Sequence, residues 1–156
     1  MEQYIRAIIE KEAAMSEKDQ ELYHTNCAEN ILRSANQKYG LNLDETYFHA
    51  ICPFGAGMQT ENTCGALLAA LAALGILFGE NKPTYNHKMK AVTIEYVRRF
   101  EAYFGSLKCS EIKAKHRDEQ DTCTPVKVKA GLLLDQVVQD ADQIYEEYMK
   151  NLAAAQ

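Results

Sequence analysis

The run "CGALLAALAALGILFG", from Cys64 to Gly79, is the most apolar stretch of the chain and decides the fold. It is shorter than the ~20 residues that a helix needs to cross a bilayer, and small alanines are frequent in it. A glycine at its end is typical of a helix terminus. The run therefore predicts a central buried helix over about residues 64–78 and gives no reason to expect a membrane partner.

The segments on either side of this helix also carry apolar residues at helical spacing. No stretch alternates as a strand does, and no repeat or long linker divides the 156 residues. The sequence thus predicts an all-α fold, a single helical domain over residues 1–156 that packs as an irregular bundle around the central helix. The other expected helices cover residues 2 to about 17, 26–39, 44 to Pro53, 85–104, a short stretch after Ser110, and 125 to about 152.

Charge and cysteine content exclude several classes of protein. Seventeen basic and 22 acidic residues give a net charge of -5, which argues against nucleic acid as a partner. The first stretch, "MEQYIRAIIEKEAAM", mixes charges with apolar residues and lacks the hydrophobic core of a secretory signal, so we expect a cytoplasmic protein. Five cysteines, an odd number, favour free thiols, a metal site or redox chemistry over a disulfide framework.

Four of the five cysteines fall within about a residue of an expected helix start. A capping box is predicted at Asn26 and Glu29, which makes Cys27 the first residue of its helix. The other three are Cys64, after Asn62 and Thr63; Cys109, before Ser110; and Cys123, before Thr124 and Pro125. None of the spacings matches a CxxC-type zinc or ferredoxin pattern, so any common site has to be assembled by the fold.

The position of a cysteine at a helix start affects the charge state of its thiol. Free N–H groups and a partial positive charge at a helix N-terminus stabilise an anion by roughly 0.3–1 kcal/mol. One helix end is too weak to make a metal site, whereas four converging ends could offset the charge of several thiolates. The alternative is that each cysteine is simply a small buried hydrophobe, which is the commoner role of this residue.

The segment "CPFGAGMQTENTCG" interrupts the helical pattern between Cys52 and Gly65. Its glycines allow backbone N–H groups at Gly55, Gly57 and Met58 to approach a bound group, although a plain turn between helices is equally consistent. His24 and His49 lie near cysteines in sequence and could replace one as a ligand. Histidines at such positions are more often ordinary surface or partly buried residues.

These features together resemble the redox-active protein family with the C_GCAxxG_C_C cysteine pattern. The resemblance is carried by "NCAENIL" around Cys27, "PFGAGM" from Pro53, "TCGALLAALAALG" from Thr63, "FGSLKCSEI" around Cys109, and the late Cys123. It implies an all-helical domain of bacterial or archaeal type, with Cys27, Cys64, Cys109 and Cys123 as the four family cysteines. Similar domains occur fused to a cytochrome that carries an iron–sulfur cluster. Cys52 lies outside the family pattern.

Our leading hypothesis is a redox protein in which these four cysteines are metal ligands that hold an iron–sulfur cluster, two-iron two-sulfur, and pass electrons to a redox partner protein. The first alternative is a thiol–disulfide or thiol-sensing protein that uses pairs of the same cysteines. The second is a structural zinc site in an interaction protein. No Ser–His–Asp constellation, phosphate motif or carboxylate pair indicates an enzyme, and both a monomer and a homo-oligomer fit the sequence.

Overall fold

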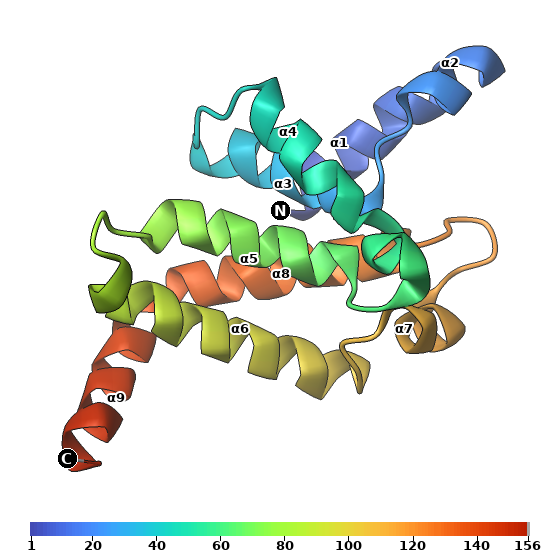
Figure 1. Cartoon of the computed structure of the whole chain (residues 1–156). Coiled ribbons are helices and arrows are strands. Elements are labelled where there is room, and N and C mark those ends of the chain that lie inside the picture. The colour runs from blue at the N-terminus through green and yellow to red at the C-terminus, as the bar shows by residue number, and fades with distance from the viewer. Residues whose placement is uncertain (156) are drawn as a thin grey trace.

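The computed structural model describes residues 1–155, which form helices joined by short loops (Figure 1). Within these residues the only β-structure is two isolated bridges, Thr63–Lys108 and Asp118–Thr122, so the all-α prediction is confirmed. Three short helical turns, η1 (Cys52–Phe54), η2 (Gly57–Glu61) and η3 (Pro83–Tyr85), lie between the main helices. The main helices are α1 (Glu2–Ala13), α2 (Glu17–Tyr23), α3 (Cys27–Tyr39), α4 (Glu45–Ile51), α5 (Gly65–Phe78), α6 (His87–Phe104), α7 (Cys109–His116), α8 (Thr124–Gln139) and α9 (Ala141–Ala154).

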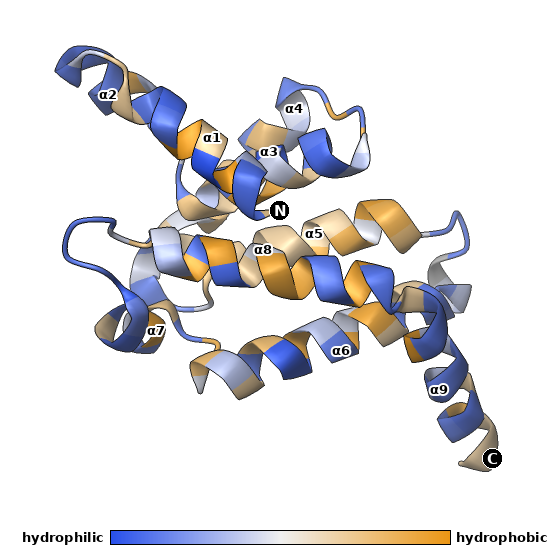
Figure 2. Cartoon of the chain, turned by 180° about the vertical axis from the view of Figure 1, so that it is seen from behind, coloured by the Kyte–Doolittle hydropathy of each residue, from blue (hydrophilic) through white to orange (hydrophobic). Residues whose placement is uncertain are grey.

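The helix α5 lies at the centre of the bundle, as its apolar sequence predicts. It packs against α3, α6 and α8, and Figure 1 shows it between the α3–α4 layer and the pair α6 and α8. Figure 2 shows α5 as a largely hydrophobic helix. Small side chains on α5 let these neighbours approach closely, and its buried residues include Ala66, Leu67, Ala69, Ala70, Ala73 and Leu74. None of the helices described between residues 1 and 155 is both long and apolar enough to span a membrane.

Local capping fixes where α3 begins and ends. The Asn26 side chain accepts hydrogen bonds from the N–H groups of Ala28 and Glu29, at 2.9 and 3.1 Å, and the Glu29 carboxylate accepts one from the Asn26 N–H. The predicted capping box is therefore confirmed, and it makes Cys27 the first residue of the helix. Gly40 ends α3 in the left-handed conformation, with φ 62°, which a side chain would strain.

The structure corrects two of the predicted helices. The first predicted helix ends at Ala13, and a separate α2 follows from a Ser16 cap that accepts the Asp19 N–H. The sequence pattern does not reveal α2, because this helix has no buried residue and hence no apolar stripe. The last predicted helix is divided into α8 and α9 at Asp140, whose carboxylate pairs with Arg99 of α6 at 2.8 Å.

Candidate functional site

All four cysteines of the predicted site begin helices. Cys27 and Cys109 are the first residues of α3 and α7, and Cys64 and Cys123 are the N-cap residues of α5 and α8. Figure 1 shows that these four helices start at the same end of the bundle. The prediction that the four cysteines stand at helix starts is confirmed, and the fold brings those starts together.

The thiol of Cys27 lies against the first residue of α5. A Cβ atom added to Gly65 would stand 2.8 Å from the Cys27 Sγ atom and 2.5 Å from the Phe54 carbonyl oxygen. Only a residue without a side chain leaves room for both contacts. Gly65 directly follows Cys64, so this close approach joins the start of α3 to the start of α5.

Backbone pairing joins the start of α5 to the start of α7. The Cys64 N–H donates to the Leu107 carbonyl oxygen at 2.9 Å, and the Cys109 N–H donates to the Asn62 carbonyl oxygen. These bonds form the antiparallel bridge between Thr63 and Lys108. Cys64 and Cys109 are therefore fixed on adjacent backbone segments, although 45 positions (109 minus 64) separate them in the sequence.

The charges of the cysteines act on one another. The pKa of Cys64 is raised to about 12, mainly by burial and in addition by the charges of Cys27 and Cys109, against the lowering effect of the Leu67 and Ala66 N–H groups. Burial also raises the pKa values of Cys109 and Cys123, and a Cys27 thiolate adds to both shifts. The charge of Cys27 thus acts on each of the other three cysteines of the set.

Cations surround the same group. Lys113 of α7 lowers the pKa of Cys109 and of Cys123, although burial outweighs this effect in both. Arg117 and Lys127 lower the pKa of Cys123 in the same way. Lys113 is also paired with the Glu61 carboxylate. The balance leaves the thiols of Cys109 and Cys123 protonated near neutral pH, and each cation favours the thiolate that a metal would require.

The glycine-containing loop has an unusual backbone. Ala56, Gly57, Met58 and Gln59 have φ values of 49°, 65°, 60° and 59°, which form a left-handed turn. Left-handed backbone costs a residue with a side chain roughly 1–2 kcal/mol, so this turn stores strain next to the site. A Cβ atom on Gly57 would stand 2.6 Å from the Cys109 Cβ atom, which shows how closely the loop packs on α7.

The loop also packs on the start of α3. A Cβ atom on Gly55 would stand 2.4 Å from the side chain of Asn26, which caps the helix that Cys27 begins. Of the three loop residues predicted near a bound group, Gly55 and Gly57 therefore contact structure next to Cys27 and Cys109. Met58 belongs to the left-handed turn and is half-buried.

The fifth cysteine stands apart from the other four. Cys52 is exposed, and the Asn26 amide group donates to its carbonyl oxygen at 3.0 Å and approaches its Sγ atom at 3.6 Å. Burial and the Glu29 charge raise its pKa, and none of the other four cysteines contributes to that shift. Cys52 therefore lies at the rim of the site.

The two histidines that were considered as substitute ligands have other neighbours. The His24 Nδ1 atom lies 3.0 Å from the Glu12 carboxylate, and the imidazole is largely exposed. His49 is exposed on α4, where its charge acts on Glu45. These contacts do not bring His24 or His49 to the cysteines.

The donor set suits a soft metal or an iron–sulfur cluster, since thiolates are the ligands that both prefer. Within residues 1–155, however, no three His, Cys, Asp or Glu side chains are arranged to hold a metal ion. The residue types fit such a group, and its binding by all four cysteines would require their thiol side chains to turn toward a common point.

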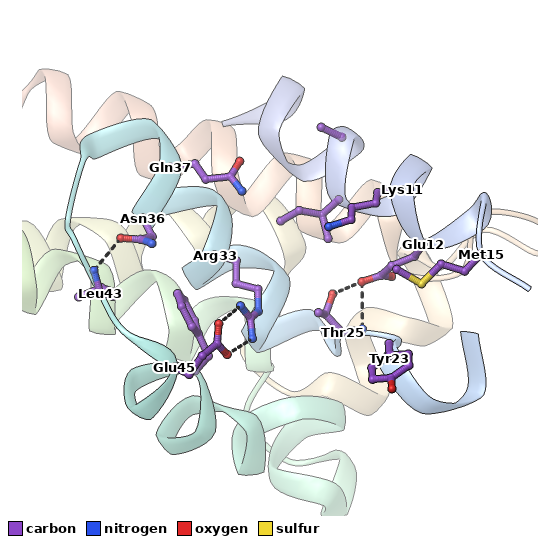
Figure 3. Close-up of a pocket in the computed structure, with 13 residues that line it drawn as sticks. Lys11, Glu12, Met15, Tyr23, Thr25, Arg33, Asn36, Gln37, Leu43 and Glu45 are labelled. Atoms are coloured by element: carbon purple, nitrogen blue, oxygen red, sulfur yellow. Dashed lines mark hydrogen bonds and ion pairs between the residues drawn. The ribbon is translucent and has the colours of Figure 1, made fainter. Parts of the chain in front are cut away.

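A separate pocket of about 540 Å³ lies among α1, α3 and the segment that leads into α4 (Figure 3). Arg33 donates two hydrogen bonds to the Glu45 carboxylate, at 3.1 and 2.8 Å, and its guanidinium lies 4.0 Å from the Phe48 ring centroid. The described residues that line this pocket include none of the five cysteines. It is therefore distinct from the cysteine site.

Two buried polar residues that each follow a cysteine of the site by one helical turn were not predicted from the sequence. Lys127 is 5% exposed and lies four residues after Cys123 on α8, inside the apolar run "VKVKAGLLL". Asn30 is 0% exposed and lies three residues after Cys27 on α3. Their spacing from a cysteine, one helical turn in both cases, is the signal in the sequence that could have identified them.

One of three comparisons with known proteins found a match. Searches of curated proteins and of solved structures found no match to the chain. One protein-family model, described as "Putative redox-active protein (C_GCAxxG_C_C)", matches residues 25–148. The matched region contains all four helix-start cysteines and the left-handed loop. Because the match spans most of the 156 residues, the chain belongs to the C_GCAxxG_C_C family of redox-active proteins.

Proposed function

We propose that Cys27, Cys64, Cys109 and Cys123 form one redox centre that holds an iron–sulfur cluster, of the two-iron two-sulfur type, and exchanges electrons with a partner protein. The observation that supports this most is that the four cysteines begin helices whose starts lie at one end of the bundle, with the Cys27 Sγ atom against Gly65, the residue after Cys64. Such a cluster takes four thiolate ligands, which is the number of cysteines in this set.

The surroundings favour anionic sulfur at this position. Each of the four cysteines stands at a helix N-terminus, where unpaired N–H groups and the helix dipole stabilise negative charge. The Cys64 thiol is within reach of the Ala66 and Leu67 N–H groups, which lower its pKa. Lys113 and Arg117 add positive charge near Cys123. When bound, an iron–sulfur cluster supplies one-electron transfer.

The protein contributes the ligands and controls their protons. Burial raises the pKa values of Cys64, Cys109 and Cys123, so these thiols are protonated at neutral pH and must each release a proton to become ligands. Cys27 and Cys123 are only half-buried, which leaves a route for these protons and for incoming metal. We expect ligand binding to depend on pH, with stronger binding as pH rises.

Thiol–disulfide chemistry is the second candidate function. It is favoured by the half-buried state of Cys27 and Cys123, whose free thiols an oxidant can reach. Cys27 would then be the shared member of alternative pairs, because its charge acts on three other thiols. Titration of free thiols before and after mild oxidant tests this. Loss of thiols in pairs from metal-free protein supports it.

Anaerobic purification followed by analysis of iron, acid-labile sulfide and zinc tests the leading proposal. We expect iron and sulfide in equal amounts, with visible absorption that is bleached by a reductant. Zinc without sulfide would instead indicate the structural zinc site. Protein that carries neither metal nor sulfide, even after incubation with iron, sulfide and a thiol reductant, contradicts the proposal.

A further inference from the structure

The pocket among α1, α3 and the segment that leads into α4 has the size of a small-molecule site (Figure 3). Its volume is about 540 Å³, and such sites commonly measure about 300–1,000 Å³. Apolar side chains form one part of the lining, and these are Ala7, Ile8, Met15, Leu43 and Phe48. The pocket therefore offers a surface on which a hydrocarbon group can be buried.

The carboxylates of the lining already have partners within the protein. The Glu12 carboxylate accepts hydrogen bonds from the N–H and hydroxyl groups of Thr25, at 3.0 and 2.5 Å, and pairs with His24 at 3.0 Å. The Glu45 carboxylate accepts two hydrogen bonds from the Arg33 guanidinium. Figure 3 shows the bonds to Thr25 and to Arg33. These contacts use the acceptor groups of the pocket, so a cationic ligand has no free carboxylate to pair with.

Several nitrogen donors of the lining, in contrast, have no such partner. Lys11 is positively charged, and none of the ion pairs among residues 1–155 includes it. The Asn36 Oδ1 atom accepts the Leu43 N–H at 3.0 Å, which orients the amide and leaves its Nδ2 group as a donor. The Arg33 Nε atom is buried and has no hydrogen-bond partner within the described chain. A buried donor without an acceptor calls for an explanation such as a bound group.

These donors belong to two helices that pack against each other, α1 and α3. Figure 3 shows the Lys11 side chain extending from α1 toward the side of the pocket where Arg33 and Gln37 project from α3. The Arg33 guanidinium is held in place by Glu45 and by the Phe48 ring, whose centroid lies 4.0 Å away. An anion in the pocket thus meets an ammonium group from α1 and oriented N–H groups from α3.

An exposed aromatic side chain borders the same pocket. Tyr23 is the last residue of α2 and lines the pocket, yet it is 64% exposed. A large apolar surface that is exposed at the edge of a pocket is typical of a binding site, because a ligand removes it from water. Tyr23 therefore adds to the apolar surface that a bound hydrocarbon group can cover.

We propose that this pocket binds a small amphipathic carboxylate, with its carboxylate group between Lys11 and the donors of α3 and its hydrocarbon group on the apolar lining. The charge of Lys11 selects an anion over a neutral molecule that has the same hydrocarbon group. The apolar lining selects an amphipathic anion over an inorganic one. The inference is independent of the proposed redox function, because the pocket lining includes none of the five cysteines.

Sodium octanoate and its neutral analogue octanamide are the probes, and each is titrated into the full chain while backbone amide signals are followed by NMR. Octanoate has about ten non-hydrogen atoms, so a dissociation constant of about 1 mM is expected. We expect octanoate to shift the signals of residues that line the pocket and to bind about fivefold more tightly than octanamide. The inference is overturned if octanoate does not bind, if its shifts lie elsewhere in the chain, or if the two probes bind equally.

The charge of Lys11 is tested by Lys11→Gln, which retains a donor and removes the charge. Lys18→Gln is the matched control, since Lys18 is an exposed lysine of α2 that does not line the pocket. We expect Lys11→Gln to weaken octanoate binding about fivefold and to leave octanamide binding unchanged. Lys18→Gln should bind both probes as the wild type does. Equal affinity of the two variants for octanoate would overturn the role of Lys11.

The apolar part of the site is tested by Ala7→Phe, which places a ring in the pocket. Ala7 is exposed and lines the pocket, whereas Ala14, the C-cap of α1, is exposed outside it, so Ala14→Phe is the control. We expect Ala7→Phe to weaken the binding of both probes about tenfold and Ala14→Phe to weaken neither. Circular dichroism checks that both variants fold, and Ala7→Leu replaces Ala7→Phe if it does not. Unchanged octanoate binding in the folded Ala7 variant would show that the ligand lies elsewhere.

Discussion

The Cys27 Sγ atom packs directly against the backbone of Gly65, at a position where an added Cβ atom would stand 2.8 Å away from it. This relationship joins the first residue of α3 to the first residue of α5, next to Cys64. Gly65 therefore has a steric role that its helical position alone does not require.

Replacement of this glycine tests that role. We expect Gly65→Ala to lower the free energy of unfolding by about 2 kcal/mol or more and to weaken metal binding, because the new methyl group overlaps both Cys27 and the Phe54 carbonyl oxygen. Urea denaturation measures the first effect and iron content the second. Gly75→Ala in the same helix is the control, since nothing lies within 4 Å of its added Cβ atom. That variant should gain about 0.5–1 kcal/mol. Equal stability of the two variants would show that Cys27 and Gly65 are not in contact.

For the unpartnered amide of Asn30 we expect that a substitution stabilises the protein, in contrast to Gly65→Ala. In metal-free protein, Asn30→Leu should raise the free energy of unfolding by about 1–3 kcal/mol, since it removes two buried polar atoms that have no partner. Asn36→Leu on the same helix is the matched control and should destabilise, because the Asn36 Oδ1 atom accepts the Leu43 N–H at 3.0 Å. A loss of stability in Asn30→Leu would mean that its amide has a partner after all.

The left-handed turn predicts that glycine at position 59 raises the free energy of unfolding. Gln59 is exposed and has φ 59° and ψ 8°, which glycine adopts without strain. Gln59→Gly should therefore stabilise the protein by about 0.5–1 kcal/mol, after allowance for the greater flexibility of glycine in the unfolded chain. Gln59→Ala, which keeps the strain, should leave the free energy of unfolding nearly unchanged. Thermal or urea unfolding of the two variants is the measurement, and a destabilised Gln59→Gly would contradict the turn geometry.

Acid should remove the stabilising effect of the ion pairs that Glu95 forms with Arg98 and Arg99 on α6. Hydrogen bonds from Arg98 and Arg99 lower the pKa of Glu95 to about 2, and Arg99 also pairs with Asp140 at the start of α9. A depressed carboxyl pKa stabilises the folded state above the unfolded value of 4.5, and this stabilisation is lost as pH falls toward 2. Solvent screening limits the effect to about 1 kcal/mol. The stability difference between wild type and Glu95→Gln, measured by urea unfolding at pH 6 and pH 2.5, should shrink by that amount; a constant difference would refute the assignment.

Much of the fold follows from local rules that the sequence displays. The apolar run after Cys64 forms the central helix, Asn26 and Glu29 form the capping box, and Gly40 and Gly105 end α3 and α6 in the left-handed conformation. Each of these depends on residues within about one helical turn, which is why the sequence alone predicts them. The position of the cysteines at helix starts follows from the same signals.

Features that depend on tertiary contacts could not be predicted in this way. The contact of Cys27 with Gly65 and the bridge between Thr63 and Lys108 join segments that are tens of residues apart. Lys127 lies among apolar residues in a pattern that also suits an exposed lysine on a helix, and only the packing of α1 and α3 on α8 buries it. Asp140, at which α8 and α9 divide, pairs likewise with Arg99 from another helix.

The claim that four cysteines form one centre is tested most directly by iron and sulfide analysis of five single variants prepared anaerobically. These are Cys27→Ser, Cys64→Ser, Cys109→Ser, Cys123→Ser and, as the control, the exposed Cys52→Ser. We predict that each of the first four loses most of its iron and sulfide while Cys52→Ser retains the wild-type content. Full iron and sulfide content in any of the first four, or its loss in Cys52→Ser alone, would contradict the account.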